Sequence, residues 1–187
     1  MHQYLDIYLR PDPEFPTHQL MAATFAKLHQ VLAHTQAARI GVSFPGYNLY
    51  PATLGDTLRL FGSSDDLTSL MKKEWLTGVS DHVTCSAIAP VPATASARRL
   101  ERVQAKGNPE RYIRRQMRRR NLPETVVRAT YKSAQPQRLH LPFVNVASSS
   151  SGQTFKLFLR LVNCNAQPVS GEFNTYGLSS TATVPWF

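Results

Sequence analysis

The sequence lacks the features that mark several large classes of protein. Its 187 residues include only two cysteines, Cys85 and Cys164, which lie far apart and form no CxxC pair. Neither a disulfide framework nor a structural zinc site is therefore expected. No apolar run approaches the roughly 20 residues that span a bilayer. The first residues also lack a basic stretch followed by an apolar one, as a signal peptide would have. The sequence predicts a soluble, cytoplasmic protein.

Acidic side chains are scarce as well, and the shortage is uneven along the chain. Asp and Glu number 12 against 21 Lys and Arg, which gives a formal net charge of +9. Residues 1–94 carry a net charge of −2 and residues 95–187 one of +11, with ten basic side chains within 98–120 alone. This asymmetry indicates a scaffold domain over 1–94 followed by a domain over 95–187 that binds nucleic acid. We expect the join in the proline-rich segment 89–95.

Hydrophobic periodicity in the first 94 residues predicts two βαβ units. Apolar side chains alternate in the strands and step by three or four in the helices, with Thr17 and Ser64 as the expected helix caps. The expected order is a strand over 4–10, a helix over 17–34, strands over 39–44 and 57–61, a helix from 64, and a strand over 81–89. Two such units predict a ferredoxin-like domain of the α+β class. We expect parallel pairing inside each unit, with the first and third strands at the centre of the sheet.

The basic part of the chain contains one strongly predicted helix. Asn108, Pro109 and Glu110 form a helix start, which predicts a helix over about 109–120 in a C-terminal α+β part. Ile113 and Met117 would pack on the protein. The spacing of the arginines places five guanidinium groups on one face, which suits phosphate oxygens; a solvated charged face usually mixes Glu with Lys instead. These arginines are Arg111, Arg114, Arg115, Arg118 and Arg119.

Two polar residues just before this helix are candidates for reading bases. Alternation in an extended segment would send Arg102 and Gln104 to the same side. Arginine can contact guanine with two hydrogen bonds, and glutamine can do the same with adenine. Exposed polar residues without a binding role would show the same alternation, so the pattern alone leaves both interpretations open.

Blocks of residues from one end of the chain to the other carry a resemblance to a known family. They are Tyr4–Ile7, Arg10–Pro16, Lys27–His29, Arg39–Pro45, Arg102–Lys106, Asn108–Arg111, Leu141–Val144, Ser148–Gln153, Tyr176–Ser179 and Val184–Phe187. In these blocks, at nearly constant spacing, the chain resembles the CRISPR repeat-processing endoribonucleases of subtype I-F. The resemblance implies an enzyme that binds the repeat stem-loop and cuts at the 3′ base of the stem. It also implies that the enzyme stays on the crRNA hairpin, with the other subunits of the surveillance complex as partners.

The same resemblance implies roles for individual residues. His29, Ser148 and Tyr176 match catalytic positions, and Arg102 and Gln104 match positions that read bases near the stem foot. Phe155 matches an aromatic residue that stacks on the terminal base pair. Ser150 and the five helix arginines match RNA-binding positions. The Gly-rich loop of the wider superfamily is reduced here to Gly171 and Gly177, and residues 122–140 receive no role.

The implied reaction needs no metal or cofactor, and it leaves a 2′,3′-cyclic phosphate and a 5′-hydroxyl. Such a reaction uses the RNA's own 2′-OH as nucleophile and needs a group that moves its proton. A histidine suits this task because an imidazole has an unperturbed pKa of about 6.5. By pattern alone a lone His29 beside Phe25 and Leu32 is more often a packed core residue. The resemblance favours catalysis, as base or acid, with the Ser148 hydroxyl orienting the 2′-OH. Acidic residues in the basic part are scattered, which argues against a cluster of metal ligands.

Two classes of function remain open from the sequence. The first is a metal-independent endoribonuclease, and the second is a non-catalytic subunit that binds an RNA hairpin. A DNA-binding regulator fits less well, because the sequence has neither a helix-turn-helix nor a zinc motif.

Overall fold

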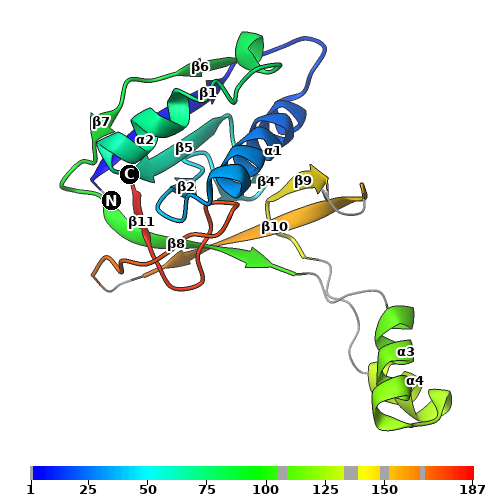
Figure 1. Ribbon diagram of the computed structural model, residues 1–187. Helices are drawn as coiled ribbons and strands as arrows, with labels where there is room; N and C mark the ends of the chain where they lie inside the picture. The colour runs from blue at the N-terminus through cyan, green and yellow to red at the C-terminus, as the bar shows by residue number, and fades with distance from the viewer. Residues whose placement is uncertain (1, 105–108, 133–138, 148–151, 165–166) are drawn as a thin grey trace. The chain divides into compact units, whose positions relative to one another are not determined.

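The computed structural model describes residues 2–104, 109–132, 139–147, 152–164 and 167–187, and only the backbone at 109–112 and 130–132. By its contacts the chain divides into two units (Figure 1). The first comprises Met1–Arg102 with Leu141–Phe187, and the second is Val103–His140. Together they form a mixed α+β structure. This division does not coincide with the expected join at residue 94, because strands from both sides of that join belong to the first unit.

The first sheet of the larger unit has two central strands, β1 (Gln3–Leu9) and β5 (Thr57–Gly62). Strand β2 (Gly41–Ser43) flanks β5, while β6 (Val83–Cys85) and β7 (Ala89–Pro90) pair with β1. The first and third predicted strands thus lie side by side at the centre. Every one of these pairs is antiparallel, so the expected parallel pairing is wrong. The two strands of each βαβ unit are not neighbours: β5 lies between β1 and β2, and β1 lies between β5 and β6.

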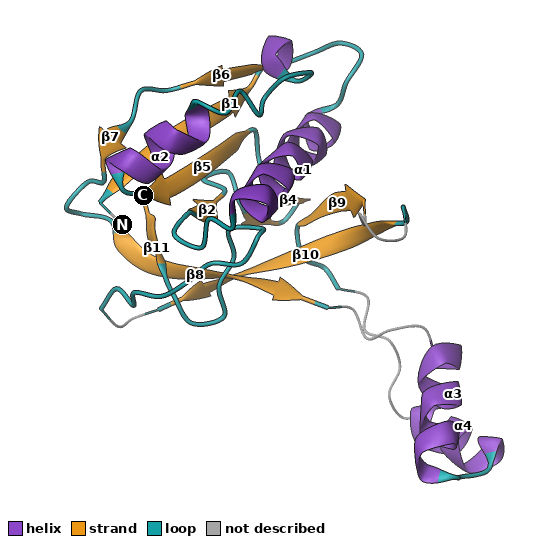
Figure 2. Cartoon of the chain, viewed as in Figure 1, coloured by secondary structure: helices purple, strands orange, loops and turns teal. Residues whose placement is uncertain are grey.

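Two helices cover one face of this sheet, α1 (Thr17–Thr35) and α2 (Ser64–Met71) (Figure 2). Their buried leucines join the apolar side chains of β1 and β5 in one core. Both predicted caps are displaced by one residue. Pro16 precedes α1 without a side-chain hydrogen bond, and Ser63, not Ser64, accepts a hydrogen bond from the Asp66 amide at the start of α2.

A second sheet has the order β11–β8–β10–β9. Its strands are β8 (Ser96–Val103), β9 (Phe143–Ala147), β10 (Thr154–Asn163) and β11 (Val184–Trp186). Val144 and Val146 of β9 are buried, and β9 packs against α1. Helix α1 therefore lies between the two sheets (Figure 1). A short hairpin of β3 (Asn48–Leu49) and β4 (Ala52–Thr53) and one turn of 3-10 helix (Ser80–His82) complete this unit.

The smaller unit is a pair of helices, α3 (Pro109–Arg120) and α4 (Glu124–Lys132). The predicted helix over 109–120 is confirmed, and Ile113 is 3% exposed against α4, where Val127 is 4% exposed. Asn108, the predicted cap, lies outside the described residues. Asn121 adopts a positive φ of 48°, the left-handed conformation that commonly ends a helix. Among the helices that the structure describes, none has the length and apolar character to cross a membrane.

Candidate active site

His29 projects from α1 beside the apolar stripe formed by Phe25 and Leu32, and its ring is half-buried. The ring stacks on Tyr176, with ring centroids 3.9 Å apart and planes 10° from parallel. Tyr176 in turn lies nearly parallel to the Phe25 ring, at 6.1 Å. The structure therefore brings together two of the three predicted catalytic residues, from segments almost 150 residues apart.

A backbone carbonyl determines which nitrogen of His29 carries a proton. His29 Nδ1 lies 2.9 Å from the carbonyl oxygen of Thr175. A carbonyl oxygen can only accept a hydrogen bond, so Nδ1 is the protonated nitrogen. In neutral imidazole the lone pair then belongs to Nε2. The geometry presents Nε2 as the atom that can accept a proton, or donate one when the ring is charged.

The loop that carries Thr175 and Tyr176 is held by Asn174. The Asn174 side-chain oxygen accepts hydrogen bonds from the amides of Tyr176 (2.8 Å) and Leu178 (3.2 Å), and the Asn174 amide donates to the Leu178 carbonyl at 2.9 Å. Gly177 then anchors the loop to β2, because the Val42 amide donates to the Gly177 carbonyl at 3.0 Å. Side-chain and backbone bonds together fix the carbonyl that orients His29.

Gly177 has no room for a side chain. Its φ of +69° is a conformation that glycine adopts freely, and an added Cβ would lie 2.5 Å from a Val42 methyl group. Although this loop contains few glycines, its packing requires a glycine at position 177.

Ser148 and Ser150 lie outside the described residues, so the third catalytic position remains a prediction. The segment that contains them connects β9 to β10, whose last described pair is Ala147 with Thr154. Strand β9 packs against α1, the helix that carries His29.

Arg102 and Phe155 lie together on neighbouring strands. The Arg102 guanidinium stands over the Phe155 ring, 5.4 Å from its centroid, and Phe155 is half-buried against the core while Arg102 is exposed. The two residues therefore form one surface of a cation and an aromatic ring. Gln104 is exposed just beyond the end of β8.

The arginines of α3 belong to the smaller unit. Four of the predicted set have exposed side chains: Arg114, Arg115, Arg118 and Arg119. The backbone of Arg111 lies in the first turn of the helix, and its side chain lies outside the described part. The helical spacing places the exposed four on one face, as predicted.

Sequence reasoning missed Thr175 and Asn174. The role of Thr175 rests on a backbone carbonyl, which every residue has, so its side chain gives no signal. Asn174 does carry a signal, since Asn followed three residues later by Gly is typical of a tight turn.

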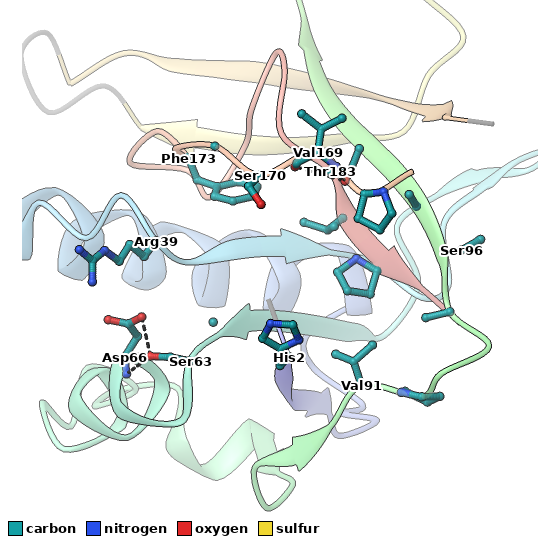
Figure 3. A pocket seen from close by; sticks show the side chains of 18 residues that line it. His2, Arg39, Ser63, Asp66, Val91, Ser96, Val169, Ser170, Phe173 and Thr183 are labelled. Atoms are coloured by element: carbon teal, nitrogen blue, oxygen red, sulfur yellow. Dashed lines mark hydrogen bonds between the residues drawn. The ribbon is translucent and has the colours of Figure 1, made fainter. Parts of the chain in front are cut away.

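The structure also contains a pocket of about 490 Å³ that none of the predicted site residues lines (Figure 3). Phe173, Val169 and Pro185 line it with the start of α2, where Ser63 bonds to Asp66. Within the described part of the chain, no three His, Cys, Asp or Glu side chains gather as a metal site. Independence of metal remains a prediction.

Comparison with known proteins agrees with the geometry. Residues 4–187 match the family described as CRISPR-associated protein (Cas_Csy4). Two relatives, from Escherichia coli (strain UTI89 / UPEC) and Pseudomonas aeruginosa (strain UCBPP-PA14), are each 46% identical over 187 residues, which is 100% of both chains. Both relatives are named CRISPR-associated endonuclease Cas6/Csy4. A family match over nearly the whole chain and full-length relatives at this identity place the protein in the Cas_Csy4 family of CRISPR-associated proteins.

Proposed function

We propose that this protein is an endoribonuclease that matures CRISPR RNA. It binds the stem-loop of the repeat and cuts the precursor at the 3′ base of the stem without a metal ion. The products are a 2′,3′-cyclic phosphate and a 5′-hydroxyl, and the protein remains on the crRNA 3′ hairpin within the type I-F surveillance complex. Full-length relatives named as endonucleases support the activity.

The arrangement of His29 is the observation that carries this proposal. Its Nδ1–H is bound to the Thr175 carbonyl, which leaves Nε2 as the working nitrogen. In the reaction, the ribose 2′-oxygen attacks the adjacent phosphorus and loses its proton, while the 5′-oxygen of the next nucleotide leaves and gains one. His29 Nε2 can take the first proton in its neutral form or supply the second when charged. The Thr175 bond suits both forms, because Nδ1 carries a proton in each.

The remaining predicted residues have complementary roles in this proposal. The Ser148 hydroxyl orients the 2′-OH, and Tyr176 supports the His29 ring from one side. Phe155 stacks on the last base pair, beside Arg102, and Arg102 and Gln104 read bases at the stem foot. The α3 arginines and Ser150 bind the RNA backbone. The basic part over 95–187 thus supplies most RNA contacts, while the helix that carries the catalytic histidine belongs to the near-neutral part.

The proposal includes three statements about context. The order and antiparallel pairing of β2, β5, β1 and β6, with two helices on one face, support a ferredoxin-like arrangement of the first domain. Repeat RNA as substrate and the other type I-F subunits as partners follow from the family. A cytoplasmic location follows from that role.

One experiment tests the chemistry directly. The protein is incubated with the host's repeat hairpin in EDTA, and the ends of the products are analysed. We expect cleavage at the stem foot with a cyclic phosphate on the 5′ fragment. A hairpin with a single 2′-deoxyribose upstream of the cut should bind and remain intact. Cleavage of that deoxy substrate would overturn the mechanism, and binding without any cleavage would instead support a non-catalytic hairpin-binding subunit.

A further inference from the structure

The second sheet has an outward face that the proposed function does not use. In the antiparallel pair of β9 and β10, Lys156 pairs with Asn145 and Phe158 with Phe143, so these four side chains share one face. Val144, Val146, Leu157 and Leu159 face the other way and are at most 2% exposed in the core. The outward face is open by contrast: Lys156 and Asn145 are exposed, and Phe143 is 38% exposed.

This face combines aromatic rings with positive charge. The Phe143 and Phe158 rings lie 5.4 Å apart at their centroids, and the Lys156 ammonium group lies 4.3 Å from the centre of the Phe143 ring. Arg160 is exposed two residues beyond Phe158. In the four strands of this sheet the one acidic side chain is Glu101, and Arg99 pairs with it at 2.6 Å. Rings that can stack on bases, with cations beside them, match single-stranded RNA.

One end of the face borders, along the chain, the segment that contains the predicted catalytic residue Ser148. The last pair at that end is Ala147 with Thr154. At the opposite end, Phe143 and Asn145 line a cavity of about 560 Å³ together with Thr17, His18 and the β4 segment. The two strands thus run from the end next to that segment to this cavity, a length of exposed surface along which RNA beyond the stem foot can lie.

We propose that the outward face of β9 and β10, with the adjoining cavity, binds the single-stranded RNA that flanks the repeat hairpin. This inference rests on the proposed function. Phe143 and Phe158 stack on bases, and Lys156 and Arg160 contact phosphates. The four-stranded sheets of RNA recognition motifs hold two or three bases on a face of this kind.

The test compares one hairpin in three forms: blunt, with four extra nucleotides at the 5′ end, and with four extra at the 3′ end. All three carry a 2′-deoxyribose at the cut, so that only binding is measured. For the wild-type protein we expect at least one extension to tighten binding about tenfold, the effect of one stacked base. In Lys156→Glu and in Phe143→Ala the gain from that extension should fall to about twofold or less. Affinity for the blunt hairpin should stay at the wild-type value.

A matched control uses Lys73, an exposed lysine in the turn after α2. Lys73→Glu makes the same change in net charge and should keep the full gain, and thermal unfolding checks that each variant is folded. Extensions that add nothing to wild-type affinity, or a gain that survives both variants, would overturn this inference and leave hairpin binding intact. Failure of the wild-type protein to bind even the blunt hairpin would overturn the proposed function, and this inference with it.

Discussion

The Thr175 carbonyl has a more specific effect on His29 than packing alone would have. Stacking on Tyr176 restricts the plane of the imidazole ring, but a flipped ring would stack equally well. The bond from Nδ1 to the carbonyl distinguishes the two orientations, because only one of them satisfies the backbone oxygen. Two contacts of different kinds therefore direct Nε2 away from the loop.

Replacing the histidine tests this assignment. His29→Ala should lower the single-turnover cleavage rate by a factor of about 10² or more, which is typical for the loss of a general acid or base. Affinity for the hairpin should remain near the wild-type value, because the proposed phosphate and base contacts lie elsewhere. His34→Ala removes an exposed histidine from the last turn of the same helix and should leave the rate unchanged. A cleavage rate for His29→Ala close to that of His34→Ala would show the assignment to be wrong.

The loop glycine gives a second prediction at the same scale. Gly177→Ala combines a positive φ with a Cβ placed 2.5 Å from Val42. We expect it to lower the free energy of unfolding by roughly 2–4 kcal/mol through backbone strain and overpacking. Gly152→Ala is the matched control: its φ is +66°, and an added Cβ meets no atom within 4 Å in the described structure. That variant should cost only about 1 kcal/mol, the backbone term. Urea unfolding of both variants measures the difference, and equal losses would contradict a tight contact at Gly177.

At the scale of elements, the sequence was informative wherever one periodicity ran over several turns or residues. It predicted the central strands β1 and β5 and the helices α1 and α3 closely, because each is a continuous element of six or more residues. It missed the β3–β4 hairpin, whose strands have two residues each, and the nine-residue helix α4, in which Val127 is the one buried side chain among residues 124–129. The antiparallel pairing of the first sheet, and the fact that β8 belongs to the larger unit, depend on contacts between distant segments. Hydrophobic periodicity along the chain does not reveal such contacts.

The same limit applies to the candidate site residues: they can be identified one by one, but not their contacts with one another. His29, Tyr176, Arg102 and Phe155 could be named from the resemblance, and the structure brings them into two close pairs. Neither pair could be predicted by spacing, since the partners come from separate elements. The backbone carbonyl that orients His29 lay beyond any reasoning from side chains.

Substitutions in the helix α3 and in the strand β8 should affect RNA binding in different ways. Arg115→Ala or Arg119→Ala should weaken binding to every hairpin alike and reduce the slope of log affinity against log salt by about 0.9 per lost duplex phosphate contact. Arg102→Ala should cost roughly 1–3 kcal/mol against the correct hairpin only, because a base contact with two hydrogen bonds is lost. Binding curves for the correct hairpin and one with an altered stem foot, each at two salt concentrations, separate the two effects. Equal weakening of both hairpins by Arg102→Ala would assign it to phosphate binding.

At the scale of the whole molecule, a buried ion pair joins the first sheet to the end of the second. Asp6 lies in the central strand β1 and is 2% exposed, although it is charged. Arg59 donates two hydrogen bonds to the Asp6 carboxylate, from Nε to Oδ1 at 2.6 Å and from Nη2 to Oδ2 at 2.8 Å. A third runs from Nη1 to the Phe187 carbonyl oxygen at 3.0 Å. The Phe187 ring covers the guanidinium at 4.0 Å. The Asp6 charge also raises the pKa of Tyr8, whose hydroxyl donates to it at 3.1 Å.

This pair makes the stability of the molecule depend on both partners being present. Arg59→Met leaves the Asp6 carboxylate buried without its cation and should lower the free energy of unfolding by about 3–5 kcal/mol. Combining it with Asp6→Leu removes the stranded charge and should recover most of that loss, because apolar side chains of similar volume can replace a buried pair. Arg99→Met is the control, since it breaks the pair with Glu101, in which the side chains are 28% and 25% exposed. Such a pair contributes about 1 kcal/mol or less. Urea unfolding of the three variants gives the comparison. If Arg59→Met cost no more than Arg99→Met, the buried pair would not be what holds the chain end to the first sheet.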